Sequence, residues 1–392
     1  MHDTFKLKLQ REKDEFTKNF EANMGKSPGD ATFGKSLVKN YGDGSKFKGQ
    51  MSGSNRHGTG IYYYTNGDIY AGDWRNNVFE GNGRYIFAGG EYYEGSLVNG
   101  KKHGRGKYIY NNGNVYEGEW AFDKKNGYGT YKYHDTQEYY SGYWNNGLKC
   151  GKGEYHYADG SKFTGEFRDG KKNGHGIVVY ANGDKFDGQF LNDETSGKGV
   201  MLYSNGDRYE GNWAHGDKSG YGVYSFAKAD GRYDTYEGEW LQGKMDGRGT
   251  MNYFNGDRYI GEWRDGKREG TGMYINAKGD VYDGHWVKDL KDGNGVLKMK
   301  DGETYDGSWK GGLKHGLGQF IFRNGDRYDG EWLTGKRHGK GMYKWHTGEQ
   351  YEGPWVFDKM NGKGNFYHQN GTSVEAVFRD DARVLLKNQG GL

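Results

Sequence analysis

Large apolar side chains alternate with small or polar ones along most of this chain, in short runs that recur at a fixed interval. The first run of each interval is an aromatic residue, any residue, Gly, any residue and a large apolar residue. Residues one, three and five of a strand share a face, because successive side chains point to opposite faces. The run therefore predicts a strand with one aromatic face. It starts at residues 47, 70, 93, 116, 140, 163, 186, 209, 236, 259, 282, 305, 328 and 351.

The interval is nearly constant. Counting a degraded copy at Val374, twelve of the fourteen steps are 23 residues, and the other two are 24 and 27 residues. The third position is Gly in all fourteen copies and the fifth is Trp in ten. The 27-residue copy has an insertion near Ala227 to Asp234, for which we expect a longer loop. Such a period indicates stacked units that bury a core which no single unit could bury.

A second strand follows about six residues after the first in each unit. It begins with Gly-x-Gly and continues with two large residues at alternate positions, as from Gly104 to Tyr110. Asn-Gly or Asp-Gly ends it, for example at Asn66-Gly67, which favours a two-residue type I′ turn. Each unit is therefore predicted to be a hairpin that pairs with the next. Its glycines leave room on the aromatic face for rings from adjoining strands.

The predicted fold class is all-β: an elongated, twisted antiparallel sheet of tandem 23-residue hairpins with a short N-terminal helix. Two strands per unit at about 4.8 Å give about 9–10 Å per unit and roughly 130 Å for the array. We divide the chain into a helix and linker (1–36), the array of fourteen repeats with terminal half-repeats (37–378) and a C-terminal cap or tail (379–392). The repeated core is represented by Tyr116, Gly118, Trp120, Tyr236, Gly238, Trp240, Tyr328, Gly330 and Trp332.

The N-terminal segment carries an apolar stripe. Phe5, Leu9, Phe16 and Phe20 would share one face of a helix from about Asp3 to Met24, for which Asp3 could serve as N-cap. We expect this helix to cap the first hairpin, to bind another protein through the stripe, or to do both with different faces. A disordered tail is the remaining interpretation.

The segments that flank the array are predicted as follows. Gly25 to Gly34 is a linker, and Leu37 to Asp43 is a lone second strand. Pro354 lacks an amide donor, so its strand should be locally irregular or unpaired on that side. The residues after Phe378 are expected to cover the last edge strand, because an open edge invites pairing with another chain. Homodimerisation through this end is the alternative.

The composition fits a folded, ring-rich sheet with a thin core. Gly accounts for 73 of 392 residues and aromatic residues for 17%, with two prolines. The 56 basic and 53 acidic residues interleave along the chain, so we expect no nucleic-acid partner. A single cysteine, Cys150, and the lack of a signal-peptide pattern favour an intracellular protein. No apolar run approaches about 20 residues, so membrane contact should be peripheral at most.

Motifs that could carry chemistry have simpler explanations here. Gly-x-Gly recurs in every unit without a following helix or Lys-Ser/Thr pair, which argues against a phosphate-binding loop. One histidine precedes it in several units, so these side chains should lie about 9–10 Å or more apart, too far to share a metal. We expect exposed loop residues at His57, His103, His315 and His338.

Acidic residues at the fourth position of the first strand should lie on the face opposite the rings. We expect a solvated face with cross-strand ion pairs there, with an acidic binding stripe as the alternative. These residues include Glu119, Glu239, Glu262 and Glu331. Cys150 has no recognisable His-Asp or His-Asn arrangement around it, which argues against a catalytic thiol.

The repeat closely resembles the membrane occupation and recognition nexus (MORN) repeat. The resemblance rests on YEGEW at Tyr116 to Trp120 and at Tyr236 to Trp240, and on YDGEWLTGKRHGKGMYKW from Tyr328. It extends over residues 41–378. Some copies depart by having Phe in place of the leading Tyr: Phe47, Phe163 and Phe186.

The resemblance implies an extended antiparallel sheet with an aromatic, Gly-rich groove, used as a spacer or scaffold. A nearly pure array most resembles the radial spoke head proteins of cilia. We therefore expect a non-enzymatic scaffold in the cytoplasm and cytoskeleton, in the axoneme of a cilium or flagellum. Its partners would be protein subunits of a large assembly, lying as extended segments in the groove. No cofactor, metal site or catalytic residue is expected, because too few residues flank the array to form a catalytic domain.

Two alternatives involve anionic phospholipid. One is a peripheral membrane adaptor similar to the junction-forming members of the family, which carry a transmembrane anchor not found here. A lipid-facing surface should also have excess Lys and Arg, worth about 1 kcal/mol each. The balance of 56 to 53 argues against the adaptor. The other alternative, a cortical or basal ring scaffold, is compatible with the same observations.

Overall fold

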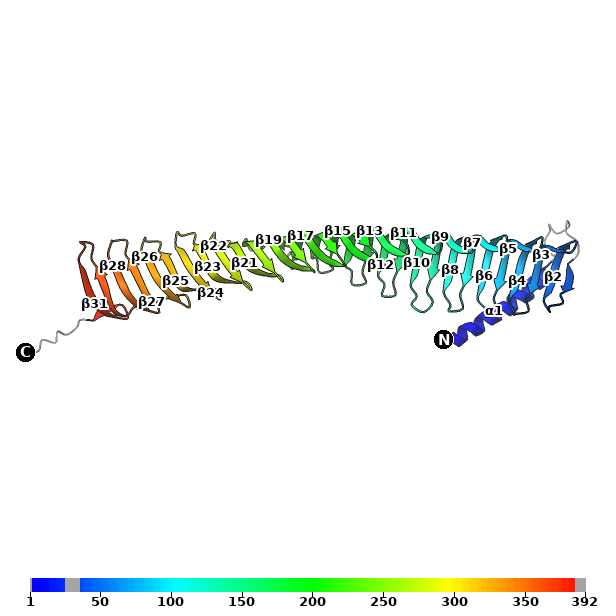
Figure 1. The fold of residues 1–392 in the computed structure, drawn as a ribbon, viewed down its shortest axis with the longest axis horizontal. Coiled ribbons are helices and arrows are strands. Elements are labelled where there is room, and N and C mark those ends of the chain that lie inside the picture. The colour runs from blue at the N-terminus through cyan, green and yellow to red at the C-terminus, as the bar shows by residue number, and fades with distance from the viewer. Residues whose placement is uncertain (1, 25–35, 385–392) are drawn as a thin grey trace, which may run out of the picture. The chain divides into compact units, whose positions relative to one another are not determined.

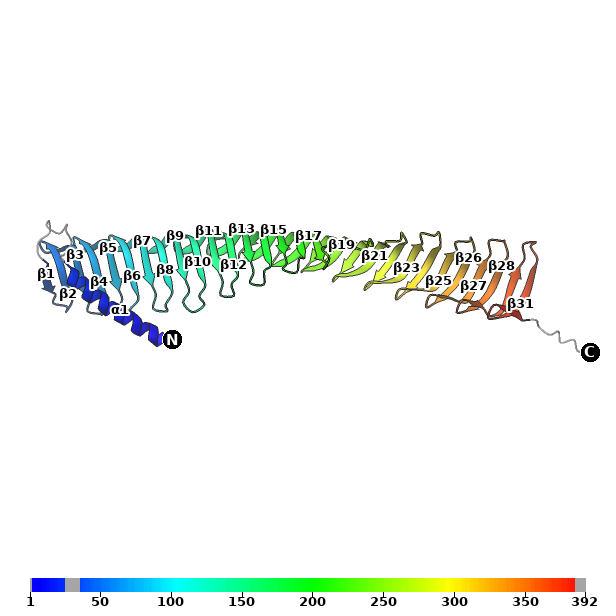
Figure 2. The ribbon, with the colours of Figure 1, turned by 180° about the vertical axis from the view of Figure 1, so that it is seen from behind.

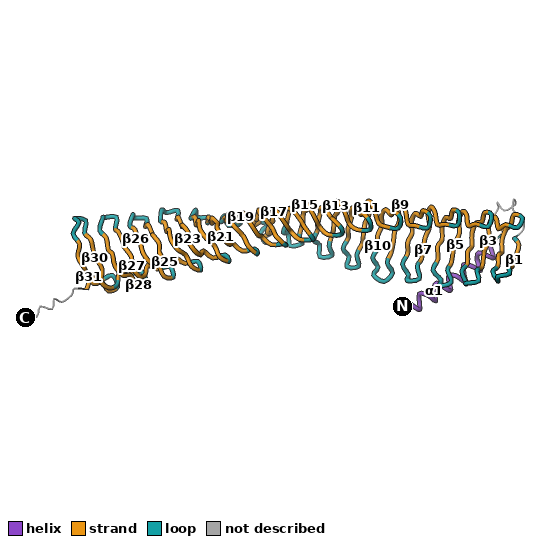
Figure 3. The backbone as a smooth tube through the Cα atoms, in the orientation of Figure 1, coloured by secondary structure: helices purple, strands orange, loops and turns teal. Residues whose placement is uncertain are grey.

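The computed structural model describes residues 2–24 and 36–384. The chain divides into two compact units, Met1–Gly197 and Lys198–Leu392. Within each unit, hairpin follows hairpin in chain order, each strand beside its sequence neighbours (Figures 1 and 3). The linker placed at Gly25 to Gly34 lies outside the described residues, as does the chain after Val384.

The first unit contains one helix and a meander of antiparallel strands. They are α1 (His2–Asn23), β1 (Leu37–Asn40), β2 (Lys46–Ser52), β3 (Asn55–Tyr63), β4 (Ile69–Arg75), β5 (Val78–Ile86), β6 (Tyr92–Val98), β7 (Lys101–Ile109), β8 (Val115–Ala121), β9 (Lys124–Lys132), β10 (Tyr139–Asn145), β11 (Leu148–His156), β12 (Lys162–Arg168), β13 (Lys171–Val179) and β14 (Lys185–Leu191). The boundary between the units falls within β15 (Glu194–Leu202).

The second unit continues the same hairpin pattern. Its strands are β16 (Arg208–Ala214), β17 (Asp217–Ala227), β18 (Tyr233–Leu241), β19 (Lys244–Asn252), β20 (Arg258–Arg264), β21 (Lys267–Ile275), β22 (Val281–Val287), β23 (Leu290–Lys298), β24 (Thr304–Lys310), β25 (Leu313–Ile321), β26 (Arg327–Leu333), β27 (Lys336–Lys344), β28 (Gln350–Val356), β29 (Lys359–Met360), β30 (Gly362–Tyr367), β31 (Ser373–Arg379) and β32 (Ala382–Val384). The all-β hairpin fold predicted from the repeat is confirmed.

The register of the strands aligns the repeated residues into rows across the sheet. Gly118 of β8 lies opposite Gly106 of β7 on one side and Gly129 of β9 on the other. Two residues before Gly118, Tyr116 lies between two further tyrosines of the same strands. After Gly118 the β8–β9 register shifts, so Trp120 is opposite Lys125. This shift is a β-bulge that recurs in most hairpins of both units.

The turns between repeats are not the predicted type I′ turns, which are found instead between the two strands of a repeat. At Asn66-Gly67 only the glycine has a positive φ, +88°, and the Tyr64 amide donates to the Asp68 carbonyl at 3.0 Å. This is a three-residue loop with a left-handed glycine, so the type I′ prediction is wrong here. Asn66 instead accepts the Asp68 amide through its side chain, at 3.0 Å. The type I′ turns lie inside the repeats, as at Phe122 and Asp123, with φ of 46° and 71°.

Helix α1 packs on one face of the first hairpins rather than over their edge (Figure 2). Phe16 and Phe20 contact a buried cluster that the sheet presents on that face. The cluster consists of Ile61, Ile69, Ala71 and Ile86. In the edge strand β1, Leu37 is 54% and Val38 58% exposed. No described helix combines the length and apolar character needed to cross a bilayer.

Polar contacts fix the position of α1 along the sheet. The Glu21 carboxylate accepts a hydrogen bond from the Tyr63 hydroxyl at 2.5 Å and lies 3.3 Å from the Lys48 ammonium. The hydroxyl is the main reason that the pKa of Glu21 is lowered. Lys13 donates to the Gly67 carbonyl at 2.8 Å, one hairpin further along the chain. The helix starts at His2, so Asp3 lies in its first turn rather than before it.

The C-terminal end is a truncated hairpin. Strand β32 pairs with β31, so the sheet continues beyond residue 378, the predicted end of the array. It covers part of the edge of β31. Near Pro354 the partner strand is interrupted at Asn361, whose amide donates to the Pro354 carbonyl at 3.0 Å. The irregularity expected at this proline is therefore present.

Candidate partner-binding face

Each unit's sheet has two chemically different faces. We call the face that carries Tyr116, Trp120, Lys125 and Tyr131 and their equivalents the ring face. The opposite face, with Glu117, Thr130 and their equivalents, is the polar face. The alternation is visible in β18, where Tyr236, Gly238 and Trp240 are buried while Glu237 and Glu239 are exposed.

Edge-to-face rings form the inner layer of the ring face. Tyr236 meets Trp240 of its own strand at 5.3 Å between centroids and 88°, and Trp263 of the next repeat at 5.3 Å and 82°. Tyr236 is fully buried and Trp240 is 5% exposed. Such pairs are favoured because the positive ring edge meets the negative ring face. Tyr116 in the first unit has the same two contacts, with Trp120 and Trp144.

The polar atoms of these buried rings are bonded to the backbone. Tyr236 donates through its hydroxyl to the Glu239 carbonyl at 3.0 Å, and Trp240 donates through Nε1 to the Gly222 carbonyl at 3.3 Å. Tyr328 and Trp332 make the equivalent bonds to Glu331 and Gly318. Burial raises the pKa of these tyrosines. The rings can therefore be buried without leaving donors unsatisfied.

Glycine is required beneath the tyrosine rings. A β-carbon on Gly238 would lie 2.5 Å from the Gly249 Cα and 2.6 Å from the Tyr236 hydroxyl. Gly118 and Gly330 would meet the equivalent atoms of Tyr116 and Tyr328. The nine residues chosen from the sequence as the repeated core thus lie together in three copies of one arrangement, with their tyrosines and tryptophans buried.

A second layer of rings lies nearer the inter-repeat loops and remains half-buried. In the first unit these rings form an unbroken series, with centroids 4.4 to 6.2 Å apart between neighbours. The series consists of Tyr108, Tyr110, Tyr131, Tyr133, Tyr155 and Tyr157. Apart from Tyr108, which is buried, these rings keep part of their surface open to solvent. A partner could therefore contact aromatic surface at every repeat.

Lysine side chains cross the ring face between the two layers. The Lys125 ammonium lies 4.2 Å from the Trp144 centroid, 4.4 Å from Tyr131 and 5.5 Å from Tyr116. Burial lowers the pKa of Lys125 to about 8. Lys102, Lys149 and Lys172 occupy the same place in their repeats, and burial lowers the pKa of each. This row was not predicted from the sequence, although a basic residue two positions before Gly-x-Gly recurs in most repeats.

The N-terminal stripe contacts the chain's own sheet. Leu9 is 2% exposed and lies against Gly90, and the Arg84 guanidinium is 4.0 Å from the centre of the Phe16 ring. Phe5 lies 5.2 Å from the His134 ring. Partner binding by this stripe therefore stays a prediction, and it would require α1 to leave the polar face.

The acidic residues at the fourth position do lie on the polar face, but their contacts differ from those expected. Glu119 accepts the Tyr128 amide at 3.3 Å, and Glu331 accepts the Lys340 amide at 3.0 Å. These amides belong to the bulges, whose glycines have positive φ and leave room for the carboxylates. Among the described side chains, no cation lies within 4.0 Å of Glu119 or Glu331. These two carboxylates thus cap bulges instead of forming ion pairs.

The histidines and the cysteine form no chemical site. His57, His103, His315 and His338 are half-buried rather than exposed. The rings of His103 and His338 each pack on a phenylalanine of the following turn. Cys150 is a half-buried thiol whose pKa is raised by burial, the opposite of an activated thiolate. No three His, Cys, Asp or Glu side chains within residues 5–24 and 36–384 are grouped to hold a metal.

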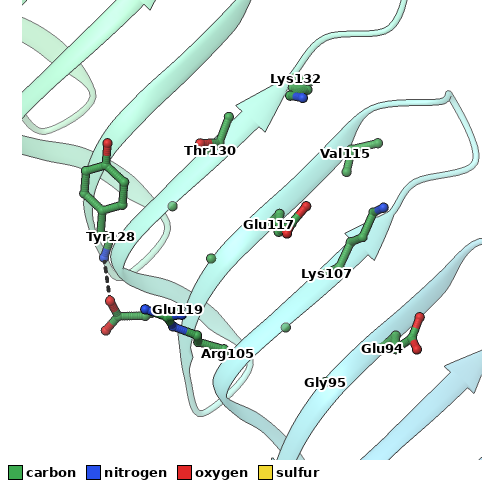
Figure 4. A pocket seen from close by; sticks show the side chains of 13 residues that line it. Glu94, Gly95, Arg105, Lys107, Val115, Glu117, Glu119, Tyr128, Thr130 and Lys132 are labelled. Carbon is green, nitrogen blue, oxygen red and sulfur yellow. Dashed lines mark hydrogen bonds between the residues drawn. The ribbon is translucent and has the colours of Figure 1, made fainter.

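A shallow hollow of about 710 Å³ lies on the polar face between β6 and β9 (Figure 4). Its charged lining residues oppose each other across strands: Arg105 pairs in register with Glu119, and Lys107 with Glu117. The hollow therefore presents charges of both signs.

Solved structures resemble this chain only weakly. The TCP domain of Drosophila melanogaster SAS-4 (dCPAP), in complex with a proline-rich motif of Ana2, is 18% identical, with 46% of this chain and 83% of that chain covered and a TM-score of 0.24. The TCP10 domain of Danio rerio CPAP with a STIL peptide is 10% identical, with 69% and 93% covered and a TM-score of 0.25. No curated protein matches the chain.

The sequence model of the MORN repeat matches fourteen consecutive segments. They are residues 47–69, 70–92, 93–115, 116–136, 140–162, 163–185, 186–208, 209–230, 236–258, 259–281, 282–304, 305–327, 328–350 and 351–373. Their starts coincide with the fourteen aromatic positions found from the hydrophobic pattern. This chain therefore belongs to the MORN repeat family.

Proposed function

We propose that this protein is a non-enzymatic structural scaffold that holds protein partners on its ring face in a cytoskeletal assembly, the axoneme of a cilium or flagellum. The observation that supports a scaffold is the recurrence of one half-buried aromatic surface at successive repeats of the described chain. The axoneme rests on resemblance to other nearly pure arrays.

The ring face suits extended protein segments. Its outer rings, such as Tyr110 and Tyr133, are half-buried, so their faces can cover apolar or proline side chains without first unfolding the sheet. The inner rings are already packed and bonded, so the surface is formed before a partner arrives. A preformed surface binds with less entropic cost than one that must be ordered.

Proximity labelling in the protein's own cell tests the proposal. The tagged chain should label proteins of the axoneme. A variant with Tyr110→Ser and Tyr133→Ser should keep its melting temperature within a few degrees but lose this labelling. A matched variant on the polar face, Glu117→Ser with Lys132→Ser, should keep it. Labelling of membrane proteins alone, or equal labelling by both variants, would contradict the proposal.

A further inference from the structure

Four lysines on the ring face of the first unit form no ion pair with a described residue. Lys102, Lys125, Lys149 and Lys172 lie in four successive repeats, and no carboxylate among the described residues is within 4.0 Å of their ammonium groups. The Lys172 ammonium donates only to the Tyr157 hydroxyl, at 3.3 Å. Four cations are thus held against rings in a row without forming an ion pair, while the carboxylates of Asp123, Glu138 and Asp193 act on three of them from beyond 4.0 Å.

In the second unit, two arginines at the same position of the repeat form ion pairs. Arg268 lies 4.4 Å from the Trp286 centroid, and its Nε is 3.1 Å from an Asp289 carboxylate oxygen. Arg337 makes the equivalent ion pair with Asp358, at 3.4 Å. Two arginines on the ring face of the second unit thus form ion pairs with their own chain, whereas Asp123 and Asp193 in the first unit bond to the backbone amides of Lys102 and Lys172.

The charge pattern favours the ring face over the polar face for an anionic partner. On the polar face the basic residues Arg105 and Lys107 stand opposite acidic residues of the neighbouring strand. On the ring face, the ammonium groups of Lys102, Lys125 and Lys149 lie against rings and form no ion pair. Charge complementarity therefore selects an acidic partner for the ring face of the first unit.

The spacing of the lysines restricts the conformation of that partner. Successive repeats are two strands apart, so the lysines recur at about 9–10 Å. A polyproline II helix has three residues per turn and rises about 3.1 Å per residue, so every third side chain returns to one side after about 9.3 Å. In a β-strand, residues three apart point to opposite faces. An α-helix returns to one side after about 5.4 Å in one turn and about 10.5 Å in two turns, so the polyproline II repeat is nearest to the lysine spacing.

We propose that the ring face between β6 and β13 binds an acidic polyproline II segment of a protein partner, with a carboxylate at every third residue. The carboxylates would meet Lys102, Lys125, Lys149 and Lys172 in turn. The intervening prolines would lie against the outer rings, from Tyr110 to Tyr157. This inference rests on the scaffold function and adds the chemistry of the segment that the scaffold holds.

The test uses the full chain and three labelled peptides. They are fifteen-residue Pro-Pro-Glu and Pro-Pro-Gln repeats and a Pro-Glu repeat that has an acid at every second residue. Fluorescence anisotropy at low salt should give about tenfold tighter binding of the Pro-Pro-Glu peptide than of the Pro-Pro-Gln peptide. The Pro-Glu repeat should bind more weakly than the Pro-Pro-Glu peptide although it carries more charge, because its spacing does not match the lysines.

Two variants of equal charge locate the binding. Replacing Lys102, Lys125, Lys149 and Lys172 with Gln should remove the preference for the acidic peptide. Replacing the exposed Lys101, Lys124, Lys152 and Lys171 with Gln should keep it. Equal loss in both variants would overturn the inference, as would equal binding of the Glu and Gln peptides by the unaltered chain.

Anionic vesicles distinguish a membrane partner from a protein one. If phosphatidylserine vesicles bind through the four lysines and the Pro-Pro-Glu peptide does not, the inference is wrong. Failure of the peptide alone leaves the scaffold proposal intact, provided that the ring-face tyrosine variant still loses its labelled partners in the cell.

Discussion

The hydroxyl of Tyr236 lies over Gly238, two residues further along the same strand. A β-carbon on Gly238 would approach that oxygen to 2.6 Å and the Cα of Gly249 in the next strand to 2.5 Å. Because Gly238 has no side chain, the Tyr236 ring can pack against the backbone and its hydroxyl can donate to the Glu239 carbonyl. Glycine and tyrosine at these positions are therefore parts of one packing unit.

Gly238→Val should lower the free energy of unfolding by about 1–3 kcal/mol, because the added methyl groups have no space on the ring face. Glu237→Val, on the exposed face of the same strand, should cost little. Urea unfolding followed by tryptophan fluorescence measures both. Glu239 is a poorer control, because its carboxylate occupies the space above Gly247. Equal shifts of the midpoint would mean that the faces are wrongly assigned.

Tyr328→Phe removes the hydroxyl that donates to the Glu331 carbonyl at 2.9 Å. The ring contacts with Trp332 and Trp355 should survive, so the loss should be about 0.5–1.5 kcal/mol. Tyr221→Phe is the control, because the hydroxyl of Tyr221 bonds to Glu237 on an exposed surface. Thermal melts should show a lower melting temperature for the first variant only. A larger loss for Tyr221→Phe would contradict the role given to the buried hydroxyl.

Stability should rise and then fall as the pH increases above 8. Burial lowers the pKa of Lys125 and Lys314 from 10.5 to about 8, so between these values the unfolded chain binds more protons and folding is favoured by higher pH. Burial raises the pKa of Tyr110 from 10.0 to about 12, so above pH 10 the folded chain binds more protons and stability falls. Melting temperatures from pH 7 to 11 measure this curve.

Replacing Lys125 and Lys314 with Met should flatten the rise between pH 8 and 10 and leave the fall above pH 10. Met keeps much of the apolar stem over the rings but has no ammonium to desolvate. A variant that kept the full rise would show that the two lysines are not its source.

Deleting residues 1–34 should expose the cluster of Ile61, Ile69, Ala71 and Ile86 that α1 covers. Aggregation or a lower melting temperature of the first unit is expected. Glu21→Ala is the milder variant, since it removes only the contacts with Tyr63 and Lys48. Light scattering and thermal melts give the readout. Unchanged solubility and melting after the deletion would contradict the covering role of the helix.

The sequence predicted the repeated hairpin and its two faces because both follow from side-chain alternation, which the chain repeats fourteen times. Tyr236, Gly238 and Trp240 could be placed together from their spacing alone. The N-terminal helix could also be predicted, from the stripe of Phe5 to Phe20. Its position on the polar face, over Ile61, Ile69 and Ile86, could not be predicted, because other repeats also have apolar residues at these places, such as Ile177 and Ile275.

The turns and the bulges could not be assigned from the same pattern. Asn-Gly fits a type I′ turn, but Asn66 is present for a side-chain bond to the Asp68 amide and only Gly67 needs a positive φ. Phe122 takes a positive φ because the register of its hairpin leaves a two-residue loop. Glu119 reaches the Tyr128 amide only because the bulge turns that amide away from the ladder. The hairpin register decides the loop length at Phe122 and the bulge at Tyr128, and side-chain alternation does not reveal it.

The central claim is that partners bind on the ring face and not on the polar face. A photo-crosslinking amino acid placed at Tyr133, on the ring face, or at Thr130, on the polar face of the same hairpin, tests it in the native assembly. The account predicts that crosslinks to proteins other than the chain itself form from position 133 and are absent from position 130. Crosslinks from position 130 alone would contradict it.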